Sequence, residues 1–296
     1  WAHRLAEGLV ERGHEVTLHA AKVNGRPETE LINGVRVVRG GNKYSVYRTA
    51  RNFFRHNSEL FDVIIEEINT RPYFAWQWSS TPVVTMIHQV ANEVWNYESR
   101  FPLSVVGRYV LEPMWLRRYK KRPLLTLSPS SAASLRSYGL ENIDVVLPGS
   151  DDDKVVSTEK EPNPTVCFLG RIVPSKRPDH ALQAFKLLQD KIPSAQIWFM
   201  GDGPMLSVLQ KHQTEGIHFL GHVTSHERAR RLSRAHVLIT TSVREGWGLN
   251  VSEAAVHGTP TIGYNSPGLV DSIVMSGGVT TPQDPESLAN ELYRFF

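Results

Sequence analysis

The chain has 296 residues, of which 41% are hydrophobic, with a formal net charge of +3 and one cysteine, Cys167. This length is enough for two separate cores, and the composition excludes a wholly disordered chain. The low net charge gives no general attraction to nucleic acid, and one cysteine excludes an internal disulfide. There is no run of 18 apolar residues and no signal-peptide pattern, so we expect a cytoplasmic protein, with a contact at the inner face of the membrane left open.

The first 150 residues alternate between strand-like and helix-like segments. Helices are predicted at 44–56 and within 124–139, where Ser128 or Ser130 is the candidate N-cap. Such alternation is typical of a parallel sheet that helices cover on both faces. Strands are predicted at residues 15–21, 33–40 (after an Asn-Gly turn), 62–67, 82–89, the start of 124–139, and 143–149.

His88 and Gln89 stand at the carboxyl end of strand 82–89. Ligands of open α/β sheets bind beyond this end of the strands, so His88 is expected where a ligand group should be. The alternative is a histidine that packs in the core or begins a helix. The spacing of the other histidines gives no pair typical of a metal site.

Residues 108–122 combine basic and aromatic side chains. As a helix, this segment would present a basic face beside aromatics, which suits contact with anionic lipid or with an anionic acceptor. An ordinary surface helix with its apolar stripe facing inward explains the same composition and is the more common arrangement. The residues concerned are Trp115, Leu116, Arg117, Arg118, Tyr119, Lys120, Lys121 and Arg122.

Residues 150–164 are charged, contain prolines and show no apolar period. This shift in composition predicts a boundary between a domain at 1–150 and a domain at 151–296. Beyond it, strands are predicted at residues 165–171, 195–204, 217–223 and 235–242, and residues 259–273 are predicted to form a strand and a Pro-Gly turn into a helix.

The stretch from Glu245 to Glu253, EGWGLNVSE, follows the strand 235–242 and opens a helix. Gly246 and Gly248 allow a tight turn and close approach to a ligand. The free amides and positive dipole at such a helix start suit a diphosphate. Carboxylates at Glu245 and Glu253 can accept hydrogen bonds from vicinal hydroxyls on either side of it, which matches the shape of a sugar nucleotide.

The longer stretch EGWGLNVSEAAVHGTPTIG resembles the signature of the retaining, GT-B-fold glycosyltransferases of glycosyltransferase family 4, also called glycosyl transferases group 1. The usual pattern is EGFGLPVLEAMACGTPVV, from which Trp247 and Asn250 depart. The resemblance covers 165–296 closely and 1–150 more loosely. It implies an α/β fold of GT-B architecture: two Rossmann-like, doubly wound parallel-sheet domains facing a central cleft. The acceptor would bind to 1–150 and the nucleotide sugar to 151–296.

The resemblance also implies the roles of individual residues. Arg171 and Lys176, in the family's G-R-x4-K pattern, would neutralise the donor diphosphate, while Gly201 and Gly203 belong to its G-x-G-P loop. A dinucleotide fingerprint is disfavoured because Leu206 replaces its third glycine. The expected catalytic residues are Glu245, His88, Arg171 and Lys176. The expected donor-binding residues are Arg171, Lys176, Gly201, Gly203, His222, Val223, Glu245, Gly248, Leu249, Asn250 and Glu253.

The predicted function is therefore a retaining hexosyltransferase of class EC 2.4. It would move a sugar from a UDP-, GDP- or ADP-sugar to a glycan, a lipid-linked acceptor or a small molecule, with no bound cofactor or metal. The Asp-x-Asp pattern in Asp151–Asp153, a metal motif in the other glycosyltransferase architecture, is interpreted as solvated linker acidity.

Two alternatives remain: a non-catalytic, nucleotide-binding GT-B subunit of a complex, and a GT-B phosphorylase. The family also has a first strand and a glycine-rich loop before the point where this chain begins, and further helices after its last residue. We therefore expect a truncated chain.

Overall fold

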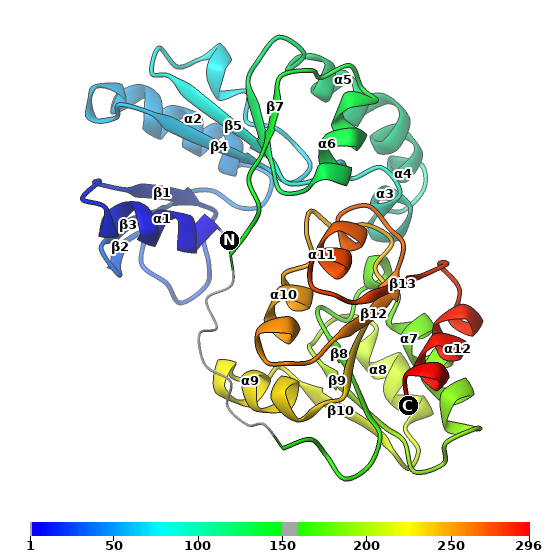
Figure 1. Cartoon of the computed structure of the whole chain (residues 1–296). Coiled ribbons are helices and arrows are strands. Elements are labelled where there is room, and N and C mark those ends of the chain that lie inside the picture. The colour runs from blue at the N-terminus through cyan, green and yellow to red at the C-terminus, as the bar shows by residue number, and fades with distance from the viewer. Residues whose placement is uncertain (1, 150–158) are drawn as a thin grey trace. The chain divides into compact units, whose positions relative to one another are not determined.

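A computed structural model describes residues 2–149 and 159–296, which fall into two compact units (Figure 1). The first unit runs to Ile87 and includes Pro123–Leu125, and the second contains His88–Arg122 and Thr126–Phe296. The domain boundary near residue 150 stays a prediction.

The first unit begins with a small mixed sheet in the order β1-β3-β2. β1 and β3 are parallel, whereas β2 and β3 form an antiparallel hairpin. Its two-residue turn has positive φ at Asn33 and Gly34, as a type I′ turn requires. The sequence predicted this turn but not β2. That strand has only four residues, two of them polar, so it lacks a recognisable strand pattern. The elements are α1 (Ala2–Glu11), β1 (Thr17–Ala20), β2 (Thr29–Ile32), β3 (Val35–Arg39) and α2 (Val46–His56).

A second sheet has the order β4-β5-β6-β7, with β4, β5 and β6 parallel. The described strands of residues 2–149 therefore form two sheets instead of the single sheet expected: no strand of β1–β3 pairs with a strand of β4–β7. The strands are β4 (Ile64–Ile68), β5 (Val83–Ile87), β6 (Leu124–Thr126) and β7 (Ile143–Val145), with 3₁₀ turns at Ser58–Leu60 and Ala75–Gln77.

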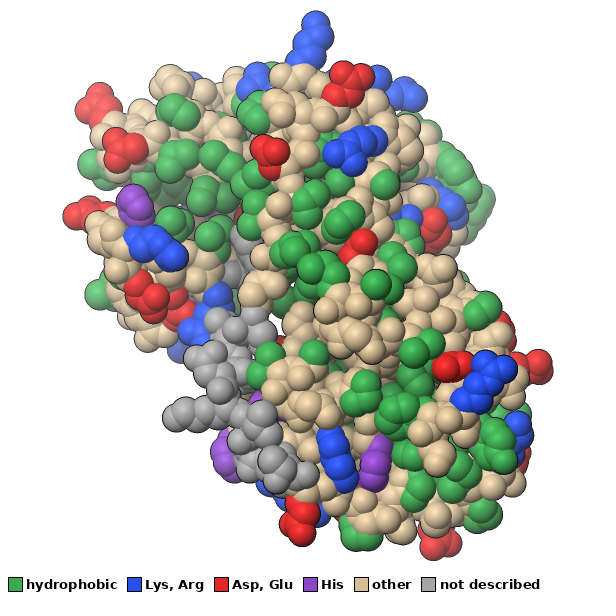
Figure 2. Space-filling view, in the orientation of Figure 1, with side chains coloured by type: hydrophobic (Ala, Val, Ile, Leu, Met, Phe, Trp, Pro, Cys, Tyr) green, Lys and Arg blue, Asp and Glu red, His purple; other side chains and the backbone are tan. Residues whose placement is uncertain are grey.

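Short helices fill the segment between β5 and β7. The helix expected over 108–122 ends earlier, at Arg117; up to that point α4, a π-helical turn at Gly107–Leu111 and α5 follow one another without a break. Ser128 is the N-cap of α6, since its hydroxyl accepts a hydrogen bond from the Ser131 amide. Figure 2 shows hydrophobic side chains gathered at the edge of the molecule over the region of α4. The α-helices are α3 (Val94–Glu98), α4 (Leu103–Val106), α5 (Glu112–Arg117) and α6 (Pro129–Arg136).

The second unit contains a six-stranded sheet in the order β10-β9-β8-β11-β12-β13, and neighbouring strands are parallel throughout. Numbered from its first strand, the order is 3-2-1-4-5-6, the doubly wound arrangement. The strand order reverses between β8 and β11, so a ligand is expected beyond their carboxyl ends. The strands are β8 (Thr165–Leu169), β9 (Gln196–Met200), β10 (Ile217–Gly221), β11 (Val237–Thr240), β12 (Thr261–Tyr264) and β13 (Val279–Thr281).

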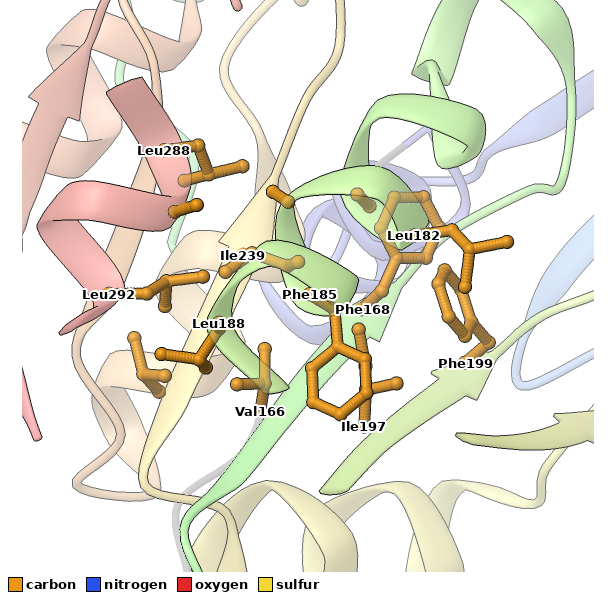
Figure 3. Close-up of a cluster of buried hydrophobic side chains, with 14 of the residues drawn as sticks. Val166, Phe168, Leu182, Phe185, Leu188, Ile197, Phe199, Ile239, Leu288 and Leu292 are labelled. Carbon is orange, nitrogen blue, oxygen red and sulfur yellow. The ribbon is translucent and has the colours of Figure 1, made fainter. Parts of the chain in front are cut away.

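Neighbouring residues of a strand point to opposite faces of the sheet. Since the residues on both faces are apolar and buried, helices cover both faces. Val166 and Phe168 pack with α7 and α12 in one core (Figure 3). Cys167 between them packs with α9 and α10 in another. The buried cysteine predicted from the sequence is confirmed, and burial raises the pKa of this thiol to about 12. The helices are α7 (Pro178–Gln189), α8 (Leu206–Leu209), α9 (Ser225–Arg234), α10 (Leu249–Val256), α11 (Leu269–Met275) and α12 (Pro285–Phe295), with 3₁₀ turns at Pro174–Lys176 and Gln210–His212.

Candidate functional site

A pocket of about 330 Å³ lies at the carboxyl ends of β8, β9 and β10. Four of the predicted donor-binding residues line it: Arg171, Gly201, His222 and Val223. Arg171 is exposed, so its guanidinium is available to a ligand. The remaining lining residues are Leu169, Gly170, Met200, Asp202 and Arg228.

Glycine is required where the loops after β8 and β9 meet. A Cβ on Gly201 would lie 1.9 Å from the carbonyl oxygen of Gly170, and one on Gly203 would lie 2.4 Å from that of Ile172. The Ile172 amide also donates to the Asp202 carbonyl oxygen at 2.8 Å. Gly201 therefore forms part of the pocket wall. Gly203 does not line the pocket, but it allows the loop after β9 to pack closely against the backbone at Ile172.

The first residues of α10 are tied to this pocket. Gly248 is the helix N-cap with φ of +94°, a conformation that a residue with a side chain rarely adopts. Asn250 donates from Nδ2 to the Leu169 carbonyl oxygen at 3.0 Å, while the side chain of Leu249 is exposed. Asn250 stands where the usual family pattern has proline, so this departure supplies a hydrogen bond that proline cannot make.

Lys176 and Glu245 form an ion pair in which both side chains are largely buried. The turn carrying Lys176 is held from behind by Thr241, whose hydroxyl contacts the carbonyl oxygens of Lys176 and Arg177, each at 2.8 Å. The Ser175 amide donates to the Glu98 carboxylate at 3.2 Å, and the Ser175 hydroxyl donates to the same oxygen. Lys176 is therefore positioned by α3 as well as by the residue that directly follows β11.

The Glu253 carboxylate lies 3.4 Å from Nε of Arg228, which reaches the pocket from α9. Glu253 itself is not among the pocket-lining residues. The structure therefore brings Glu253 to the pocket through Arg228, a residue that the sequence did not single out. Within the basic helix sequence SHERARRLSR, nothing distinguishes Arg228 from its solvated neighbours.

His88 directly follows β5 and is partly buried. A Cβ on Gly246 would lie 2.8 Å from the carbonyl oxygen of His88. The backbone at His88 therefore lies against the loop that carries Glu245. The structure brings these two predicted catalytic positions together.

This loop is further fixed by a buried arginine that sequence reasoning missed. Arg244 donates from Nε to Glu93 at 2.8 Å and from Nη1 to the Ser134 hydroxyl at 3.0 Å. Burial acts to raise the pKa of Glu93, but the hydrogen bond and charge of Arg244 outweigh it, so that pKa is lowered. No local signal could have revealed the pair, because Glu93 and Arg244 are 151 residues apart.

Asp151–Asp153 lie outside the described residues. Within residues 2–149 and 159–296, no group of three or more His, Cys, Asp or Glu side chains is arranged to hold a metal ion. No helix in the same part of the chain has the length and apolar character needed to cross a membrane.

Comparison with known proteins identifies the family. Residues 149–296 match the family described as "Glycosyl transferases group 1", and residues 1–154 match "Glycosyltransferase Family 4". The chain belongs to glycosyltransferase family 4. The resemblance based on the Glu245–Glu253 stretch is thereby confirmed.

Two curated relatives of this family 4 chain cover only part of it. Sulfoquinovosyl transferase SQD2 of Arabidopsis thaliana is 27% identical over 72% of this chain and 42% of its own length. A Mycobacterium tuberculosis protein named GDP-mannose-dependent alpha-(1-6)-phosphatidylinositol dimannoside mannosyltransferase is 28% identical over 41% of this chain and 32% of its own. The chain thus matches less than half the length of each.

The solved structure of sucrose-phosphate synthase from Thermosynechococcus elongatus superposes with a TM-score of 0.77. It covers 99% of this chain and 82% of its own, at 19% identity. The likeness shows the fold, and the α/β fold of GT-B type predicted from the sequence is confirmed.

Proposed function

We propose that this chain is a retaining glycosyltransferase that takes a nucleotide-diphosphate sugar as donor and acts without a bound metal ion. The observation that carries the proposal is the pocket at the ends of β8, β9 and β10, where Arg171 is exposed beside the first turn of α10. A donor diphosphate in this place would meet a guanidinium and a helix N-terminus, both of which favour phosphate oxygens.

Lys176 would supply the second positive charge. Its ammonium group has three donors, so it can remain paired with Glu245 and still bind a phosphate oxygen. Two fixed cations would then neutralise the charge that develops on the leaving diphosphate, which is the task of Mg²⁺ in many other enzymes. This is the basis for proposing that the reaction is independent of metal.

The two carboxylates would hold the sugars on either side of the diphosphate. Glu245 would accept hydrogen bonds from hydroxyls of the transferred sugar, with His88 beside its anomeric carbon. Glu253 would accept them from the ribose diol, with its position set by Arg228. His222 and Val223 would meet the base through their backbone, which is compatible with UDP-, GDP- or ADP-sugars. The relative named for its dependence on GDP-mannose supports a donor of this class.

In the proposed step, the acceptor oxygen bonds to the anomeric carbon while the bond from that carbon to the phosphate oxygen breaks. Both events occur on the same face of the sugar, and the departing phosphate oxygen takes the acceptor's proton. No enzyme carboxylate becomes covalently attached, and the anomeric configuration is retained. The acceptor would be a glycan, a lipid-linked molecule or a small molecule.

Slow transfer to water tests this proposal without knowledge of the acceptor. The full chain is incubated in EDTA with α-linked UDP-, GDP- and ADP-hexoses, and the first-formed sugar is followed by proton NMR before mutarotation. We expect release of the α-anomer from one donor and loss of this activity in Glu245→Gln. Release of the β-anomer would contradict retention, and an absolute need for Mg²⁺ or Mn²⁺ would contradict metal independence.

A further inference from the structure

The segment 99–140 is far more positive than the protein as a whole. It contains eight Lys or Arg residues and one acidic residue, Glu112, whereas the entire chain has a net charge of only +3. We call the exposed part of this segment the basic–apolar surface. The basic residues are Arg100, Arg108, Arg117, Arg118, Lys120, Lys121, Arg122 and Arg136.

Glu112 does not neutralise this surface. It is 3% exposed and accepts hydrogen bonds from the amides of Ala91 and Asn92 and, at 3.2 Å, from Nε1 of Trp95. Burial raises the pKa of this carboxyl, although its hydrogen bonds act in the opposite direction. Residues 99–140 therefore present basic side chains to solvent with no exposed acid among them.

The same segment exposes large apolar side chains. Leu116 in α5 and Tyr119 in the turn after it point inward and are at most 4% exposed, so the segment does have the buried stripe of an ordinary surface helix. A second apolar set points outward: Phe101 is 81% exposed, Tyr109 63% and Val110 55%. An inward-facing stripe alone does not account for this set. Its other members are Leu103, Val105, Val106 and Met114.

Three of the outward apolar side chains border an open pocket of about 720 Å³. Tyr109, Val110 and Met114 line one part of it, and Arg117, Lys120 and Arg136 line another. These three basic residues come from α5, from the turn that follows it and from the end of α6. The pocket thus offers several cations to one anion while an apolar surface adjoins it.

We propose that the basic–apolar surface docks on a bilayer that contains anionic phospholipid, with a lipid phosphate held among Arg117, Lys120 and Arg136. Charge complementarity selects this partner. Exposed apolar side chains would enter the boundary between head groups and acyl chains, while the surrounding Lys and Arg side chains remain at the anionic head groups. The inference goes beyond the proposed donor site and does not depend on it, because vesicle binding is measured without any nucleotide.

The test is co-sedimentation of the full chain with vesicles of phosphatidylcholine, with and without phosphatidylglycerol. We expect binding to the anionic vesicles, little binding to neutral ones, and release by salt. The triple variant Arg117→Glu, Lys120→Glu, Arg136→Glu should bind roughly 100-fold more weakly. The matched control carries the same charge change at exposed sites elsewhere and should bind as the wild type does: Arg51→Glu, Arg55→Glu, Lys211→Glu.

A second pair of variants tests the apolar contribution. Leu103→Ser, Tyr109→Ser and Val110→Ser together should weaken binding, whereas the equally exposed set Leu31→Ser, Val208→Ser and Val274→Ser should not. The salt dependence of the wild type keeps the inference testable if a variant fails to fold. Equal binding to neutral vesicles, no binding, or equal loss in a control variant would overturn it. Displacement from vesicles by soluble glycerol 3-phosphate would show a site for free phosphate and would also overturn it.

Discussion

The proposed donor site and the basic–apolar surface both contain Lys and Arg side chains, but these charges have different partners. In the proposed donor site, Lys176 is paired with Glu245 and Arg228 with Glu253. On the basic–apolar surface, Arg117, Lys120 and Arg136 surround an open pocket, and Glu112, the acid nearest in sequence to Arg117 and Lys120, is buried. Paired charges have fixed positions and suit a ligand of defined shape. A cluster of one sign produces a diffuse field and suits an extended anionic surface.

The sharpest test of a fixed charge is Lys176→Ala. If Lys176 neutralises charge that develops only as the diphosphate leaves, kcat should fall by roughly 100- to 1000-fold, the range for removal of one preorganised donor. Steady-state turnover of the sugar nucleotide measures this, and Lys211→Ala is the control. A kcat within a few-fold of wild type would place the diphosphate away from Lys176.

Arg171 is expected to act more through binding. Arg171→Ala should weaken the affinity for nucleoside diphosphates by about 1.5–3 kcal/mol, the range for a hydrogen bond to a charged group. Isothermal titration with UDP, GDP and ADP measures this change. Added salt should weaken nucleotide binding less than it weakens vesicle binding, because few charges take part in a defined pocket. Unchanged nucleotide affinity in the variant would remove Arg171 from the donor site.

A smaller effect is expected for Glu98, which positions Lys176 only indirectly, through Ser175. Glu98→Ala removes the acceptor for the Ser175 amide and hydroxyl, and should lower kcat/KM about fivefold, equivalent to about 1 kcal/mol. Glu98→Gln, which keeps one carbonyl acceptor, should restore most of the loss. In the Glu98→Ala background, Ser175→Ala should then cost little more. Fully additive effects would show that Glu98 does not act through Ser175.

The smallest effect concerns pH. Hydrogen bonds from Arg230 and Arg231 lower the pKa of Glu227 from 4.5 to about 2. Because the folded-state pKa is the lower one, the ionised carboxylate stabilises the fold above pH ~4.5, and this contribution is lost as the pH falls towards ~2. Glu227→Gln should therefore flatten the pH dependence of urea unfolding there, by at most about 1 kcal/mol for so accessible a group. An unchanged pH profile would contradict the assignment.

Much of the second unit was predictable from sequence because its signals are local. The buried strands, the Gly201–Gly203 loop and the turn into α10 each follow from a few adjacent residues. The supporting contacts were not predictable, since Glu98 meets Ser175 across 77 residues and Ser130 meets Asp271 across 141. The same limit applies to the basic–apolar surface. Its composition was evident, but only the fold shows that Leu116 points inward while Tyr109 and Val110 point outward.

The central place of β8 has a further consequence, for amide hydrogen exchange. Residues 166–168 pair with β9 on one side and β11 on the other, and they are at most 3% exposed. Their amides should exchange only when the whole unit unfolds, because no local opening frees both ladders at once. Arg171, two residues beyond β8, is thus attached to a slowly exchanging part of the sheet.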